Sequence, residues 1–138
     1  MADLKGLIRL RRHELDERRR ALGELNAKVE ALNQRRQDVL RKLEKEKNLA
    51  AVDINAAQGF GQYLNGALNT CRALDDEIER IMVDVEKATD IVREAFMEVK
   101  KLELTQENRD KEAEELMAKL ETAELDEAGL NAHRRRAD

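Results

Sequence analysis

The hydrophobic residues in the first fifty positions recur at spacings of three and four residues. With Leu15 taken as position a of a heptad, eleven of the fifteen a and d positions in residues 1–50 are apolar. This spacing, sustained over seven heptads, is typical of an α-helix that packs against another helix along one seam, the row of a and d positions. Opposite charges four residues apart, as in Glu14 and Arg18, support the same helix.

The second half of the chain repeats the pattern more regularly. Eighteen of the twenty-one a and d positions between Phe60 and Leu130 are apolar. The exceptions are Gln106, Arg109 and Glu127. The pattern therefore predicts a second, longer amphipathic helix.

Residues 51–58 decide how the two helices are connected. Both halves share one heptad phase, so phase alone permits a continuous helix in a parallel dimer. Asp53 and Asn55 are good N-cap residues, and the stretch from Asn55 to Gln58 resembles a capping box. Three glycines of low helix propensity follow: Gly59, Gly61 and Gly66. These signals favour a reversal of the chain.

We therefore predict an all-α fold in which two long helices form an antiparallel coiled-coil hairpin. The prediction is a single domain over residues 1–138, with a helix over 3–51, a turn at about 52–56 and a longer helix over 56–135. A reversal near residue 53 places the N-terminus opposite Leu102–Gln106.

Residues 107–133 then have no partner within the hairpin, although they carry an apolar stripe. The stripe consists of Ala113, Leu116, Leu120, Ala123 and Leu130. A second copy, a fold-back or another protein could cover it, so homo-oligomerisation through 107–133 stays open.

The composition agrees with long helices. Of the 138 residues, 41% are charged and 2% are aromatic, and proline is absent, which disfavours a β-rich fold. Residues 1–50 carry 14 Lys/Arg and 9 Asp/Glu, whereas residues 51–138 carry 12 and 21. The basic first half and the acidic second half would attract each other when laid side by side.

Several function classes are disfavoured by simple observations. Cys71 is the single cysteine, so no internal disulfide and no multi-cysteine metal site are expected. The start of the chain lacks the apolar segment of a secretory signal. The uncharged stretch Ile54–Cys71 contains five side-chain amides, which would be costly in hydrocarbon. We expect a soluble, cytoplasmic protein.

No motif predicts catalysis or a cofactor. The glycine spacing of Gly61–Gly66 is that of a phosphate loop, but Ala67 and Leu68 follow in place of Lys and Ser/Thr. Neither His13 nor His133 has a second ligand at helical spacing, carboxylates excepted. We therefore predict a protein that is not an enzyme and that holds no metal or cofactor.

Arginine clusters near both ends raise the possibility of an RNA-binding helical arm. Six arginines lie within residues 9–20, and Arg134–Arg136 lie near the end of the chain. Carboxylates interrupt the first run, no aromatic platform accompanies either run, and the chain is acidic overall. Nucleic-acid binding is therefore not expected, but it remains an alternative.

Three stretches resemble the FliJ family, the soluble stalk component of the flagellar (type III) protein-export apparatus. They are the basic opening Leu7–Arg20, the aromatic pair in Phe60–Leu64, and Arg93–Glu103. The length and the predicted hairpin are also similar. The resemblance implies a non-enzymatic stalk or adaptor at the inner-membrane export apparatus, attached to it peripherally through protein contacts.

The resemblance also implies partners and their contact residues. A hexameric export ATPase would receive the end that carries both termini. We expect the uncovered stripe and the arginines after it to make this contact, through Leu116, Leu120, Leu130, Arg134, Arg135 and Arg136. The cytoplasmic domain of the export gate would contact the start of the second helix, through Phe60, Tyr63 and Leu64. Export chaperones would be further partners. A prefoldin-like or other coiled-coil chaperone or scaffold is the main alternative function.

Overall fold

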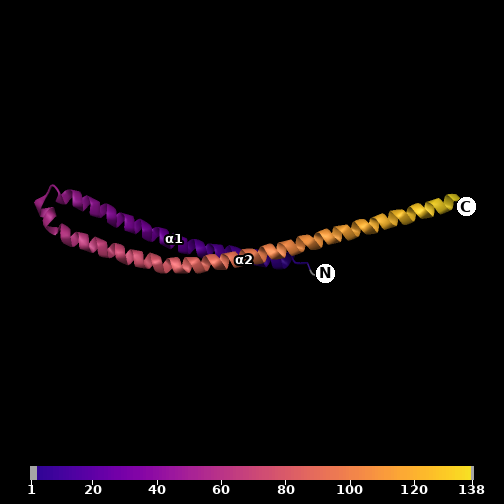
Figure 1. Cartoon of the computed structure of the whole chain (residues 1–138), viewed down its shortest axis with the longest axis horizontal. Coiled ribbons are helices and arrows are strands. Elements are labelled where there is room, and N and C mark those ends of the chain that lie inside the picture. Colours follow the sequence, from indigo (N-terminus) through magenta and orange to yellow (C-terminus); the bar gives the residue numbers. More distant parts are fainter. Residues whose placement is uncertain (1–2, 138) are drawn as a thin grey trace. The chain divides into compact units, whose positions relative to one another are not determined.

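The computed structural model describes residues 3–137, and these residues form two α-helices joined by a short turn (Figure 1). Helix α1 comprises Lys5–Ala50 and helix α2 comprises Ile54–Ala137. No strand occurs between residues 3 and 137. The all-α prediction with a longer second helix is therefore confirmed. Met1, the first predicted a position, lies outside the described residues.

The chain reverses over residues 51–53, so the alternative of one continuous helix is wrong. The Asp53 carbonyl accepts the first helical hydrogen bond of α2, from the Ala57 amide at 3.0 Å. The Asp53 carboxylate also accepts a bond from the Asn55 amide at 2.9 Å. Asp53 is thus the N-cap, and it satisfies an amide that the helix itself leaves unpaired.

The turn and the start of α2 differ from the expected bounds. The turn was expected at 52–56 and the second helix from 56, but α2 begins at Ile54 because Asp53 caps it. Asn55 therefore lies inside the helix. The glycines at 59, 61 and 66 are helical as well, and none of the described glycines has a positive φ.

The chain divides into two compact units, each containing parts of both helices. In the unit Glu14–Ala95, the two helices lie side by side and are joined by the turn (Figure 1). Five buried side chains form its core: Leu15 and Leu32 of α1, and Ala67, Cys71 and Leu74 of α2. Because a turn of only three residues joins the side-by-side helices, they run antiparallel here, and Arg36 Nε of α1 lies 2.8 Å from Asp75 Oδ1 of α2.

The other unit comprises Met1–His13 and Phe96–Asp138. Within it, Ile8 of α1 and Val99 of α2 are buried. The Leu4 amide donates a hydrogen bond to Gln106 Oε1 at 3.0 Å. The first residues of the described chain therefore meet α2 in the stretch Leu102–Gln106, as the heptad register predicts.

All seven buried residues of the described chain occupy predicted a or d positions. Burial of apolar surface stabilises such packing by about 25 cal/mol per Å², and it is the main favourable contribution. The seam is therefore the source of stability in both units.

We predict that Leu74→Ala destabilises the fold much more than Leu68→Ala. Leu74 is 4% exposed at a d position, whereas Leu68 is 39% exposed on the same helix. Truncation of a buried leucine costs about 2–5 kcal/mol, and a change on the open surface costs less than about 0.5 kcal/mol. Urea unfolding followed by circular dichroism measures both variants, and equal losses would contradict the seam.

Candidate partner-binding surfaces

The described chain offers surfaces rather than an enclosed site. Residues 3–137 contain no group of three or more His, Cys, Asp or Glu side chains that could hold a metal ion. No helix among them is long and apolar enough to cross a membrane. Three surfaces stand out instead: the start of α2, the contact at the start of α1, and the C-terminal part of α2.

The start of α2 presents Tyr63 to solvent in the unit Glu14–Ala95. Tyr63 is 40% exposed, while Phe60 and Leu64 are half-buried in the seam. Of the three residues expected to bind the export gate, Tyr63 is therefore exposed, whereas Phe60 and Leu64 pack in the seam. Tyr63 lies outside the a and d positions, which is the reason that it is exposed.

Tyr63 lines an open groove of about 350 Å³ between the two helices. Val39 and Lys42 of α1 form one wall, and Gly66, Ala67 and Thr70 of α2 complete the lining. A tyrosine ring beside a groove is an effective anchor, because it offers a large apolar face and a hydroxyl together. Lys42 adds one positive charge to the groove, which would favour an acidic group on a partner.

The start of α1 is held to α2 by a chain of polar contacts in the other unit. Asp3 Oδ1 accepts a hydrogen bond from the Lys5 amide at 3.0 Å and so caps α1. Gln106 accepts from the Leu4 amide, and its Nε2 donates to Asp110 Oδ1 at 2.9 Å. Gln106 therefore satisfies a backbone group of α1 and is fixed in turn by Asp110.

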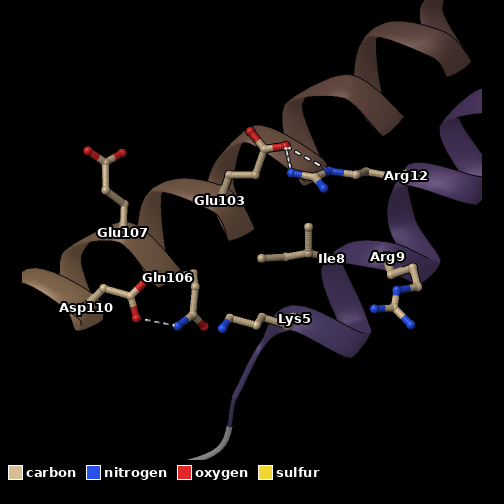
Figure 2. Close-up of a pocket in the computed structure, with 8 residues that line it drawn as sticks. All are labelled: Lys5, Ile8, Arg9, Arg12, Glu103, Gln106, Glu107 and Asp110. Carbon is tan, nitrogen blue, oxygen red and sulfur yellow. Dashed lines mark hydrogen bonds and ion pairs between the residues drawn. The ribbon is translucent and has the colours of Figure 1, made fainter. Parts of the chain in front are cut away.

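Glu103 forms the second attachment, as Figure 2 shows. Arg12 extends from α1 and donates from Nε and Nη2 to Glu103 Oε1, at 3.2 and 2.9 Å. Lys100 Nζ lies 3.2 Å from Glu103 Oε2. The hydrogen bond from Arg12, followed by that from Lys100, holds the pKa of Glu103 below its ordinary value of 4.5.

These contacts surround a groove of about 530 Å³ whose floor is Ile8 (Figure 2). Cationic residues Lys5 and Arg9 come from α1, and the acidic residues Glu107 and Asp110 come from α2. Sequence analysis did not identify Arg12 and Glu103 as a pair. The sequence signal for a polar contact here was Gln106, a polar residue at an a position of the seam.

The C-terminal part of α2 is uncovered. Every residue from Asp110 to Ala137 is exposed. Leu116, Leu120 and Leu130, three of the residues expected to meet the ATPase ring, expose 52–59% of their surface. Arg134, Arg135 and Arg136 form the exposed last turn of the helix.

A further groove of about 500 Å³ lies where this exposed segment begins. Its lining includes the acidic residues Asp3, Asp110 and Glu112, the basic residues Lys5 and Arg109, and the apolar residues Ala113 and Leu116. The seam of α2 thus continues past the start of α1 as a surface of the same shape, without α1 upon it. Such a surface suits an additional helix.

We predict that the attachment of α1 weakens in acid. Because the pKa of Glu103 is lowered in the folded chain, its contribution is present above about pH 4.5 and is lost as the pH falls below that value. Glu103→Gln should remove this part of the pH dependence, whereas Glu98→Gln on the same helix should retain it. Amide-exchange protection factors of residues 5–12, measured from pH 6 to pH 3, test this; identical profiles for both variants would refute it.

One family of known proteins matches this chain. The family model described as "Flagellar FliJ protein" matches residues 1–138, the full length. No curated protein and no solved structure matches it. The whole-length match confirms the resemblance carried by the basic opening and the aromatic pair. The chain therefore belongs to the flagellar FliJ family, a non-enzymatic component of flagellar protein export.

Proposed function

We propose that this protein is a non-enzymatic stalk and adaptor of the flagellar type III export apparatus. It links the hexameric export ATPase to the cytoplasmic domain of the export gate, and it receives export chaperones. It works in the cytoplasm and attaches to the inner-membrane apparatus through protein contacts.

The observation that supports this proposal most is the uncovered part of α2. An apolar stripe that stays exposed from Asp110 to Ala137 loses the stabilisation that packing gives the rest of the helix. A partner that encloses the segment restores that stabilisation. A ring of subunits is a suitable enclosure, because it can contact a single helix from several sides.

The chemistry of each part of this segment indicates what that part would contact. Leu116, Leu120 and Leu130 would contact apolar residues of the ring, and the arginines at 134–136 would meet acidic groups or helix C-termini. Tyr63 would anchor the gate, with Phe60 and Leu64 supporting its helix from within the seam. The two contact sets lie in different units of the chain, which suits a protein that binds two partners.

We predict that truncation after Arg109 abolishes stimulation of the export ATPase while the remaining chain stays folded. The truncation keeps Gln106 and Glu103, which attach α1, and of the contacts described there it loses only the hydrogen bond from Gln106 to Asp110. The described residues that it removes are all exposed. The measurement is ATP hydrolysis by the cognate hexamer with the full-length and the truncated protein, each checked by thermal unfolding. Equal stimulation by both proteins would exclude the segment from the mechanism.

We predict that Tyr63→Ala weakens binding to the gate's cytoplasmic domain by about tenfold or more, because anchors of this kind contribute at least 1–2 kcal/mol. The melting temperature should stay within about 2 °C of the original, because Tyr63 lies outside the seam. Phe96→Ala, at a comparably exposed aromatic position of α2, is the matched control. Titration calorimetry measures binding, and equal affinities of the two variants would remove Tyr63 from the gate contact.

A coiled-coil chaperone of the prefoldin type is the alternative, since it would also use exposed leucines near a helix end. ATP hydrolysis distinguishes the two functions, because such a chaperone has no reason to stimulate the export ATPase. A salt titration of RNA binding tests the remaining alternative, since binding through arginines to phosphates weakens steeply with salt.

A further inference from the structure

The exposed C-terminal segment, residues 110–137, retains the heptad pattern that is buried elsewhere in the chain. Its a positions are Ala113, Leu120, Glu127 and Arg134, and its d positions are Leu116, Ala123, Leu130 and Ala137. All eight are exposed. A helix with the same pattern could cover them, and a second copy of this segment is such a helix.

Glu127 determines how two copies can pair. In a parallel, in-register pair, Glu127 would face Glu127 of the second copy at the centre of the interface, where like charges repel. In an antiparallel pair, a positions face d positions. Leu120 then faces Ala123, Ala113 faces Leu130, Glu127 faces Leu116 and, at the edge of the pair, Arg134 faces Arg109, with no carboxylate opposite another.

The flanking positions favour the same antiparallel register. Antiparallel helices bring g positions together, and here they pair Lys119 with Asp126 and Glu112 with His133 of the second copy. Each pairing occurs twice by symmetry. No two like charges meet at the flanking positions of this register.

The distribution of charge along the segment supports it too. All nine acidic residues of 107–137 lie before Ala128, and three arginines lie at 134–136. Parallel copies would align acidic with acidic stretches. Antiparallel copies bring Arg134–Arg136 of one to the start of the other, where Glu107 and Asp110 lie beside Arg109.

The groove at the start of the segment has a mixed lining, in which Asp3, Asp110 and Glu112 are acidic, Lys5 and Arg109 are basic, and Ala113 and Leu116 are apolar. A second copy that runs antiparallel to α2 runs parallel to α1, so its C-terminal end approaches the N-terminal end of α1. The partial negative charge of one helix end then meets the partial positive charge of the other.

We propose that two copies of this protein associate through residues 110–137 as an antiparallel pair, in the register that places Lys119 of each copy opposite Asp126 of the other. This pairing covers Leu116, Leu120 and Leu130. On the proposed function, the dimer is therefore a resting form that must dissociate before the segment enters the ATPase ring.

Disulfide trapping tests the register on full-length chains with Cys71→Ala. One chain carries Leu120→Cys and another carries Ala123→Cys, and they are oxidised alone and as a mixture. The antiparallel pair predicts that the mixture yields a crosslinked dimer and that each chain alone yields much less. Crosslinking of each chain with itself would show a parallel pair, and an absence of crosslinks in the mixture would overturn the proposal.

Charge exchange tests the same contact without cysteines. Lys119→Asp and Asp126→Lys should each weaken dimerisation about tenfold, because two attractive pairs become repulsive. The double variant should restore it, and Lys111→Asp, away from the interface, should leave it unchanged. Sedimentation equilibrium gives the dissociation constants.

A chain that stays monomeric at its highest soluble concentration, or a double variant without restoration, would overturn the dimer. Neither measurement includes the ATPase, so their failure is independent of the proposed function. If the charge variants lose the dimer and still stimulate the ATPase in full at low protein concentration, dimerisation and ring contact are separate properties of one segment.

Discussion

Burial of the heptad seam is the constraint on which the rest of the structure depends. Each buried residue of the described chain lies on it, and none of them is charged. The ion pairs between the helices are partly exposed, and pairs of that kind contribute about 0–1 kcal/mol each. The seam therefore sets the stability of the hairpin and determines which faces of the helices meet, while the ion pairs Arg36–Asp75 and Arg12–Glu103 contribute little.

The features that follow from the seam could be predicted from the sequence. The hairpin, the position of the start of α1 near Gln106 and the exposure of Tyr63 all follow from which residues occupy a and d. The two-residue error at the start of α2 has a different origin, because Asp53 and Asn55 are equally good caps and only the conformation of the turn selects one. Likewise, the sequence offers Arg12 the acidic residues Glu94, Glu98 and Glu103, and the pairing with Glu103 depends on the relative shift of the two helices.

The charge asymmetry of the sequence has a structural counterpart in both units. The basic α1 contributes Arg36 and Arg12, and the acidic α2 contributes Asp75 and Glu103. Beyond Gln106 the acidic excess of α2 has no basic helix beside it among residues 3–137. The same imbalance that attracts the helices along their paired length thus leaves the end of α2 open to basic surfaces of other molecules.

The unequal sequence separation of these contacts has a consequence for synthesis. Arg36 and Asp75 are 39 residues apart, but Leu4 and Gln106 are 102 residues apart. A ribosome that adds roughly 5–20 residues per second needs on the order of 5–20 s to produce that interval. During this time the apolar face of nascent α1 around Ile8 lacks its native cover, whereas residues near the turn find theirs quickly. The first turns of the protein are therefore those most in need of protection by factors at the ribosomal exit.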